Sequence, residues 1–367
     1  MPQNSSTAEA KRNQLARHWY GRFMLYLASV LYGIVVGIRE KLYKAGKLKS
    51  EKLDIPVICV GNLSTGGTGK TPAIITLCEL LLKEKRVPAI LSRGYKRSRN
   101  RDSVTAIDAG EIPPKEECGD EPLMIAQQLG HRVPVLVSPN RYASGTVAAF
   151  QYNADIAIMD DGFQHFQLKR DLNIVLVNAM QPFTRDHLLP YGNLREKPKG
   201  LERASVVIIT HCELADKKEI SSLRDAIRKY TFAPIIEGEH KPLAFFEADT
   251  EKDMPLDYFN GKKVSVLSGI GNPESFEANI RQHGAEINQI WRYPDHHQYT
   301  EKELRSARNA AGSDAIITTF KDFARFPENW RDIIGRKLYI LKISMKMNSK
   351  DENSLLNMIL NIKGSVK

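Results

Sequence analysis

Residues 61–72 read GNLSTGGTGKTP, and this stretch decides the fold of the chain. It lies between two apolar runs, residues 55–60 and 73–82, which predict a strand before it and a helix after it. A glycine-rich turn between a strand and a helix binds phosphate, because its backbone N–H groups and the N-terminus of the helix point at the anion. The stretch therefore predicts a nucleotide site.

Individual residues of this loop have expected roles. Lys70 is placed to reach the β- and γ-phosphates of ATP, and the Thr71 hydroxyl to bind Mg²⁺. The general motif has a glycine where this chain has Ser64, so we expect Gly66 and Gly67 to supply the backbone freedom. A glycine-rich linker is the alternative, and it poorly explains a Gly-Lys-Thr between a strand and a helix. We expect nucleotide contacts from Ser64, Thr65, Gly66, Gly67, Thr68, Gly69, Lys70 and Thr71.

Short apolar runs alternate with segments of helical spacing along the rest of the chain. The runs at 55–60, 87–92, 133–138, 156–160, 173–179 and 205–210 predict strands, and 71–85, 120–130 and 140–151 predict helices. This alternation predicts a P-loop NTPase-like α/β fold, with a mostly parallel sheet covered by helices on both faces. Strands at 264–268, 286–291, 315–319 and 338–343, with helices at 273–283 and 300–311, predict a second, smaller α/β lobe.

The chain has 367 residues, of which 42% are hydrophobic and 26% charged, so it is long enough for two globular domains. Its four cysteines include no C-x-x-C pair, so neither a cysteine zinc site nor a disulfide framework is expected. We predict five segments: a basic N-terminal segment with an apolar helix (1–53), a P-loop lobe (54–233), a linker (234–250), a second α/β lobe (251–345) and a C-terminal helix or tail (346–367).

The basic character of the chain is local. Residues 1–53 carry a charge of +7 out of a net +10, and sixteen residues without a charge lie between Arg22 and Arg39. As a helix this run spans about 24 Å, less than the roughly 30 Å hydrocarbon core of a bilayer. Aromatic and basic flanks suit a membrane surface. We predict a peripheral or monotopic membrane helix, against the alternatives of a buried core helix and a cleaved signal peptide, and no nucleic-acid partner.

Asp160 and Asp161 follow the apolar run 156–159. Carboxylates at the end of a buried strand near a phosphate-binding loop usually hold the Mg²⁺ of the nucleotide. One binds the metal directly, and the other holds its waters or orients a nucleophile. A solvated strand end is the alternative. Gln164 and His165, which follow in the same turn, offer an amide and an imidazole beside the metal.

Three more loops carry polar groups suited to a site. Arg93 and Tyr95 belong to SRGY (92–95), Asp120 to GDEP (119–122), and His296 and His297 to YPDHH (293–297). From position alone, Asp120 is better explained as a helix N-cap, and surface placement explains the two histidines. A neutral imidazole next to a carboxylate is also a plausible proton acceptor.

The order GNLSTGGTGKTP, SRGY, GDEP, MDDGFQH, PYGNLRE, YPDHHQY and TTFKD resembles the tetraacyldisaccharide 4′-kinase family of lipid A biosynthesis. The resemblance runs from residue 15 to residue 345, and MDDGFQH together with the variant phosphate-binding loop is highly specific. Ser64 fits this family better than it fits the general motif. Tyr191 of PYGNLRE differs from it, because a small residue is often found there.

The resemblance implies phosphorylation of the 4′-hydroxyl of a tetraacyl-glucosamine disaccharide 1-phosphate, dependent on ATP and Mg²⁺, with lipid IVA as the product. It implies two lobes around the site and a location on the cytoplasmic face of the inner membrane of a Gram-negative-type bacterium. Asp120 would be the base, paired with His296. This role of Asp120 replaces its interpretation as a helix N-cap. Asp160 would hold Mg²⁺, supported by Asp161 and Gln164.

The resemblance and the loop positions together define the expected substrate contacts: Arg93, Tyr95, Gln164, Arg195 and Glu196. Two rival hypotheses stay open at this point. One is a membrane-bound P-loop switch, in which nucleotide hydrolysis drives a conformational change and no acceptor is phosphorylated. The other is a nucleic-acid-binding ATPase, which ranks low because the basic residues flank an apolar helix.

Overall fold

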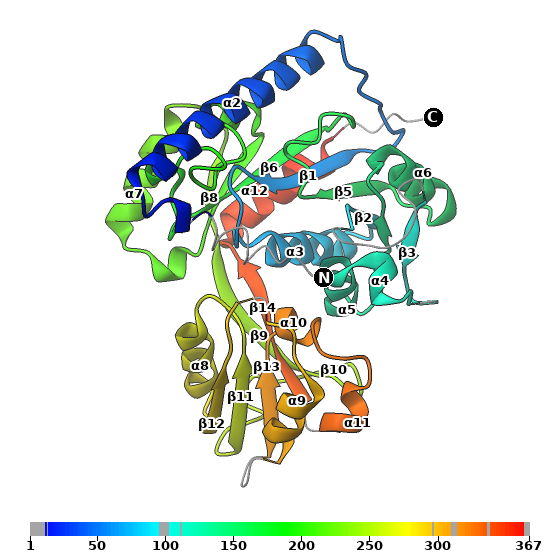
Figure 1. Cartoon of the computed structure of the whole chain (residues 1–367). Helices are drawn as coiled ribbons and strands as arrows, with labels where there is room; N and C mark the ends of the chain where they lie inside the picture. The colour runs from blue at the N-terminus through cyan, green and yellow to red at the C-terminus, as the bar shows by residue number, and fades with distance from the viewer. Residues whose placement is uncertain are drawn as a thin grey trace.

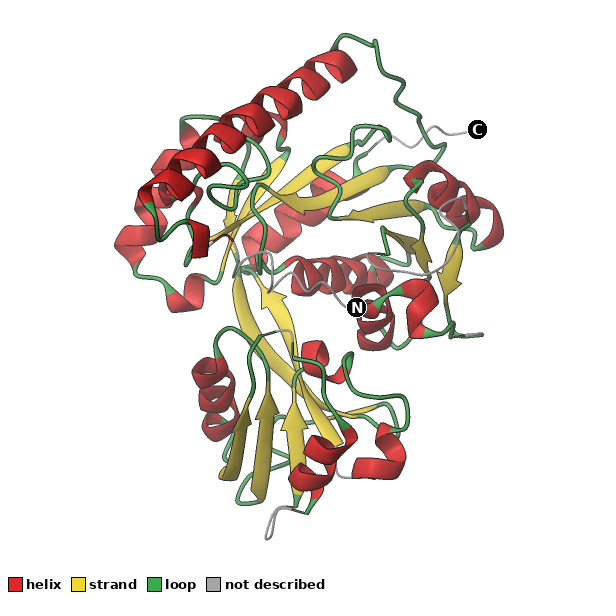
Figure 2. Cartoon of the chain, in the orientation of Figure 1, coloured by secondary structure: helices red, strands yellow, loops and turns green. Residues whose placement is uncertain are grey.

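The computed structural model describes residues 12, 14–94, 103–110, 112–295, 297–309, 314–335 and 338–362. Two α/β lobes lie one beyond the other, joined by a ribbon of two strands, and a long helix, α2, lies along the outside of the first lobe (Figures 1 and 2). Each lobe is built on its own sheet. This confirms the predicted fold class.

Within the described residues, the first sheet has eight strands, all parallel to their neighbours except the edge pair β3–β4. Six of them match the predicted apolar runs, whereas β3 and β8 were not predicted. In spatial order the strands are β3 (Thr105–Ile107), β4 (Val135–Val137), β2 (Pro88–Ser92), β5 (Ile156–Asp160), β1 (Val57–Asn62), β6 (Leu172–Asn178), β7 (Val206–Thr210) and β8 (Ile235–Glu237).

Helices cover both faces of the first sheet, as burial of a parallel sheet requires. One face packs against α3 (Lys70–Lys83), α5 (Asp120–Gln128) and α12 (Ser349–Leu360), and the other against α6 (Arg141–Gln151) and α7 (Lys217–Arg228). Helix α12 follows the second lobe in sequence, yet Leu355 and Ile359 pack in the first-lobe core. The shorter elements are α4 (Lys115–Cys118), η1 (Phe183–Arg185), η2 (Pro198–Arg203) and η3 (Cys212–Leu214).

The second sheet has six strands in the described part of the chain, and it mixes parallel and antiparallel pairs. Its order is β10 (Lys252–Met254), β9 (Glu239–Glu247), β14 (Leu338–Lys346), β13 (Ala315–Thr318), β11 (Lys263–Ser268) and β12 (Glu286–Arg292). One face packs against α9 (Glu301–Arg308), α10 (Phe320–Phe323) and α11 (Trp330–Ile334), and the other against α8 (Pro273–Gln282).

The antiparallel strands β9 and β14 run from the first lobe into the second (Figure 1). At the first lobe, the Thr76 hydroxyl of α3 donates to the carbonyl of Met345 at 3.1 Å and accepts from its N–H at 3.2 Å. The segment 234–250, predicted as a linker, contains β8 of the first sheet and β9 of the second. The five segment limits stay a prediction.

Helix α2 (Trp19–Lys44) is longer than the uncharged run that predicted it. Among the described residues, α2 is the one helix whose length and composition would allow it to cross a membrane. Its large apolar residues are mostly exposed, so the alternative of a buried core helix is wrong. It is fastened to the loop before β7: the Ser29 hydroxyl donates to the Leu188 carbonyl and the Tyr32 hydroxyl to the Arg195 carbonyl, both at 2.9 Å.

Candidate active site

The phosphate-binding loop leaves the carboxyl end of β1 and opens α3, as predicted. Gly66 and Gly69 have φ values of 107° and 76°, a left-handed conformation that favours glycine. Lys70 is the first residue of α3, and Thr71 follows it with its side chain partly exposed. The backbone freedom therefore lies at Gly66 and Gly69, whereas Gly67 has no positive φ.

Buried polar side chains hold the loop from below. The Asn62 amide donates to the Thr68 hydroxyl at 2.7 Å, and the Asn178 amide donates to the carbonyl of Gly67 at 3.0 Å. The Thr210 hydroxyl, at the end of β7, donates to the carbonyl of Thr68 at 3.1 Å. Strands β1, β6 and β7 thus each contribute one hydrogen bond that fixes the shape of the loop.

The PYGNLRE loop lies beside the start of the phosphate-binding loop. The Thr65 N–H donates to the carbonyl of Asn193 at 2.8 Å, and the Arg195 N–H donates to the carbonyl of Leu63 at 2.7 Å. Ser64 and Leu194 form an isolated antiparallel bridge between the same segments. Backbone pairing therefore brings Arg195 and Glu196 to the nucleotide site.

Asp161 lies between two cations. Its carboxylate accepts hydrogen bonds of 2.8 and 2.7 Å from one guanidinium nitrogen of Arg195, and Lys70 Nζ is 3.6 Å from its Oδ1. Burial raises the pKa of Asp161, but Lys70 and Arg195 outweigh that effect and hold its pKa below the usual value. Asp161 is an ionised partner of Lys70 at neutral pH, and its backbone is left-handed at φ 50°.

Asp160 ends β5, between β1 and β2, and is 4% exposed. One carboxylate oxygen, Oδ2, accepts from the Ser92 hydroxyl at 3.2 Å, while Oδ1 is buried without a hydrogen-bond partner among the described residues. Burial, with the neighbouring carboxylates of Glu121 and Asp161, raises its pKa to about 7. A buried carboxylate with an unpartnered oxygen fits a hard divalent cation such as Mg²⁺.

Gln164 and Glu196 form one network behind the loop. The Gln164 amide donates to Glu196 Oε1 at 2.7 Å and to the carbonyl of Asn62 at 2.9 Å. Arg203 pairs with Glu196 Oε2 at 2.6 Å and with Glu40 of α2 at 2.9 Å. The N-terminal helix is therefore connected through Arg203 to Glu196.

Asp120 is the first residue of α5, and Gly119 is the N-cap, so the interpretation of Asp120 as the cap is wrong. Its side chain is 44% exposed and lies 3.3 Å from Lys115 Nζ. Met124, four residues on and therefore on the same face of α5, packs in the second-lobe core with Tyr299. This face of α5 is turned to the second lobe.

His297 is occupied within its own lobe. Its Nε2 lies 3.1 Å from Glu303 Oε1, and its ring stacks on Tyr293 at 4.5 Å and meets Tyr299 edge-on at 4.9 Å.

Arg93 is exposed at the end of β2. Of the predicted site residues, Tyr95 and His296 lie outside the residues that the structure describes.

Sequence reasoning missed Arg141. It is 3% exposed at the start of α6, donates to the carbonyl of Ser138 at 2.6 Å, and lies 3.4 Å from the carbonyl of Asp160. Burial lowers its pKa to about 10, so it stays charged at pH 7. The signal was present, because Arg141 is the one charged residue in residues 141–151 and lies at the start of the helix predicted at 140–151, shortly after the strand predicted at 133–138.

His165, predicted to lie beside the metal, carries no charge at neutral pH. Burial and the nearby cations Arg141 and Arg170 lower its pKa to about 4. It is therefore neutral in a strongly cationic region, which suits a hydrogen-bonding role better than a charge-bearing one.

Because a phosphate-binding loop opens α3 at the carboxyl edge of a parallel sheet, next to the buried carboxylate that ends β5, the chain is a P-loop nucleotide-binding protein. Residues 21–362 match the family model of tetraacyldisaccharide-1-P 4′-kinase, and the chain belongs to this family. The resemblance found in the motifs is thereby confirmed.

Named relatives support the assignment along nearly the whole chain. Tetraacyldisaccharide 4′-kinase of Elusimicrobium minutum is 40% identical over 347 residues, 94% of this chain and 92% of that protein. The protein of the same name from Anaeromyxobacter dehalogenans strain 2CP-C is 35% identical over 326 residues, 88% of this chain and 86% of that protein. The crystal structure of LpxK from Aquifex aeolicus in complex with ATP matches with a TM-score of 0.76 and 31% identity, covering 93% of this chain and 99% of that chain.

Replacing Asn178 by Ala removes the amide that holds the Gly67 carbonyl. One such hydrogen bond contributes about 0.5–1.5 kcal/mol, so we expect ATP affinity to fall roughly two- to tenfold. Calorimetric titration with ATP measures it. Asn357→Ala, at an exposed position of α12, is the matched control and should leave affinity unchanged. Equal affinities for both variants would show that the loop keeps its shape without this bond.

Proposed function

We propose that this chain transfers the γ-phosphate of ATP to the 4′-hydroxyl of a tetraacyl-glucosamine disaccharide 1-phosphate at a membrane surface, forming lipid IVA. The observation that carries the proposal is the meeting of the two lobes at α5. The P-loop lobe supplies the donor site, and the helix that begins with Asp120 packs through Met124 against the second lobe. An acceptor held between the lobes meets both.

On the donor side, the chain supplies charge to the transferring phosphoryl group. In the structure Lys70 is neutralised by Asp161, with Arg195 on the other side of the same carboxylate. When ATP binds, Lys70 turns to the phosphates, and Arg195 keeps Asp161 ionised and fixed. Phosphoryl transfer depends mainly on such positioning and charge stabilisation.

On the acceptor side, the partly exposed carboxylate of Asp120 accepts the proton of the 4′-hydroxyl. The hydroxyl oxygen then bonds to the γ-phosphorus as the bond to the β-phosphate oxygen breaks, leaving ADP. His296 of the second lobe orients Asp120 or shares the proton. The engagement of His297 by Glu303 and Tyr293 supports His296 as the working imidazole.

Asp160, with the Thr71 hydroxyl, is the proposed ligand of Mg²⁺, and Asp161 supports it. When bound, Mg²⁺ neutralises charge on the β- and γ-phosphates. The buried Oδ1 of Asp160 has no hydrogen-bond partner among the described residues, and a directly coordinated cation would supply one. Arg93, Tyr95, Gln164 and Glu196 remain proposed contacts of the substrate or its surroundings.

Helix α2 is the proposed membrane contact, on the cytoplasmic face where ATP is present. Its exposed apolar residues include Met24, Leu31 and Val35, each more than 60% exposed. Burial of such surface in lipid is favourable. The side of α2 that carries Ser29 and Tyr32 stays attached to the loop of Arg195.

The proposed reaction is tested with ATP, Mg²⁺ and the disaccharide 1-phosphate dispersed in detergent. We expect labelled γ-phosphate on the lipid, and Lys70→Ala should lower the rate about 10²–10³-fold, as loss of one charge-stabilising donor does. Phosphate released only to water, with no labelled lipid, would support the P-loop switch instead.

The assignment of the base predicts separate effects for three variants. Asp120→Asn and His296→Gln should each lower kcat about 10²-fold or more, the range for loss of an acid–base group. His297→Gln should retain most activity. Because Gly119 and not Asp120 is the N-cap, and the Asp120 carboxylate is 44% exposed, the unfolding midpoint of Asp120→Asn should match that of Asp225→Asn, an exposed control on α7. If activity falls only in step with thermal stability, the role of Asp120 is structural.

The membrane contact is tested by Leu31→Gln with Val35→Gln, two exposed positions that leave Ser29 and Tyr32 in place. We expect the double variant to lose most of its sedimentation with anionic lipid vesicles, because it has less apolar surface to bury in the lipid. Phe150→Gln, 69% exposed on α6, is the control and should sediment like the parent chain. Unchanged sedimentation of the double variant would contradict the assignment of α2.

A further inference from the structure

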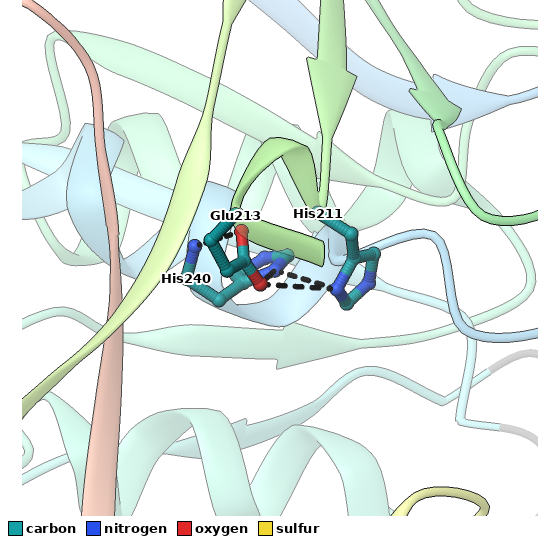
Figure 3. A group of neighbouring side chains, drawn as sticks. All are labelled: His211, Glu213 and His240. Carbon is teal, nitrogen blue, oxygen red and sulfur yellow. Dashed lines mark hydrogen bonds and ion pairs between the residues drawn. The ribbon is translucent and has the colours of Figure 1, made fainter. Parts of the chain in front are cut away.

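Two histidines and a glutamate converge where the first lobe meets the ribbon. His211 follows β7 directly and precedes the short helix η3, Glu213 lies in η3, and His240 is the second residue of β9 (Figure 3). None of the three belongs to the motifs that indicated the kinase site. Their ligand atoms lie within 4.8 Å of one another.

Each side chain offers one atom to the same point. His211 Nδ1 and His240 Nδ1 are 3.0 Å apart, and Glu213 Oε1 lies 3.7 Å from the first and 3.8 Å from the second. Ligands at 2.0–2.1 Å around a tetrahedral ion are separated by roughly 3.3 Å. The three atoms therefore have nearly the spacing of one face of a tetrahedral site.

The backbone fixes this arrangement. Glu213 Oε2 accepts from the His240 N–H at 3.0 Å, which leaves Oε1 to face the imidazoles. His211 is held in a left-handed conformation at φ 59°, and the preceding Thr210 is bonded to the phosphate-binding loop. Cys212 takes no part, because its thiol donates to the carbonyl of Ile209 in the core.

We propose that His211, Glu213 and His240 bind a divalent transition-metal ion of the Zn²⁺ class. Two imidazoles and one carboxylate form a common three-residue zinc ligand set, in which a water takes the fourth position. The side chains of His211 and Glu213 are 26% and 24% exposed, which leaves room for that water. Mg²⁺ prefers six oxygen ligands, so this site is distinct in chemistry from the nucleotide metal.

The protonation state suits metal binding. Burial and the neighbouring His211 lower the pKa of His240 to about 4, so its imidazole is neutral at pH 7 and binds an ion without first losing a proton. Glu213, whose pKa is lowered by its hydrogen bonds to His211 and the His240 backbone against the effect of burial, is ionised.

The position of the site gives the ion a consequence. His211 and Glu213 belong to the first lobe, and His240 to a strand that runs into the second. The other ring nitrogen of His240 lies against the phosphate-binding loop, since a Cβ added to Gly69 would be 2.6 Å from it. A bound ion therefore ties the start of the ribbon to the loop that holds ATP.

Co²⁺ titration of the metal-free full-length chain, in excess Mg²⁺ to saturate the nucleotide-side carboxylates, tests the site. We expect one equivalent of Co²⁺ with the intense visible absorption of tetrahedral coordination, lost when Zn²⁺ is added. His240→Gln and Glu213→Gln should weaken binding by about 100-fold or more, since even outer partners of a metal site change affinity 10–100-fold. His283→Gln, at the end of α8, is the matched control and should bind like the parent.

Thermal unfolding separates loss of the ion from loss of the fold. With EDTA present, the ligand variants should unfold at the temperature of the parent chain; Zn²⁺ should then raise the midpoint of the parent and of His283→Gln only. Absence of the tetrahedral spectrum, or its survival in His240→Gln, would overturn the proposal and leave a hydrogen-bonded cluster. The measurement needs no lipid acceptor, so its outcome is independent of the proposed kinase reaction.

Discussion

The ion pair between Asp161 and Lys70 is the contact on which the rest of the site depends. Through it the phosphate-binding loop is joined to the end of β5, and through Arg195 the same carboxylate is joined to the PYGNLRE loop. Three segments far apart in sequence thus meet at one carboxylate. Asp161 is partly buried, and Lys70 and Arg195 both compensate its negative charge. Removing one of these two cations would leave the carboxylate with a single partner in surroundings that solvate a charge poorly.

The neighbouring Asp160 shows how the sheet divides the work between two adjacent carboxylates. Asp160 is the last residue of β5 and still pairs within the sheet. The backbone turns at Asp161, which has a left-handed conformation, and the side chain of Asp161 lies near Lys70. One carboxyl is therefore kept in a dry position with its pKa raised, and the other among cations with its pKa lowered. Two identical side chains acquire different properties from one reversal of the backbone.

The fold was largely predictable because long apolar runs and the GNLSTGGTGKTP loop specify strand, turn and helix locally. Strands β3 and β8 were not, since neither lies in an apolar run as long as residues 133–138, the run that predicted the equally short β4. Asp120 was misjudged as a cap because the helix begins one residue earlier than that interpretation requires, at Asp120 itself, so that Gly119 is the N-cap. The grouping of His211, Glu213 and His240 depends on how β9 passes η3, which no local spacing encodes.

Arg203 couples the position of α2 to a buried carboxylate of the nucleotide lobe. One guanidinium, 11% exposed, joins Glu40 of that helix to the buried Glu196 of the nucleotide lobe. A shift of α2 that moves Glu40 therefore changes the electrostatic surroundings of Glu196, because the same guanidinium pairs with both carboxylates. A contact that holds α2 in this position therefore also stabilises the arrangement of Glu196 and of Gln164, whose amide donates to Glu196 and to the carbonyl of Asn62 at the start of the phosphate-binding loop.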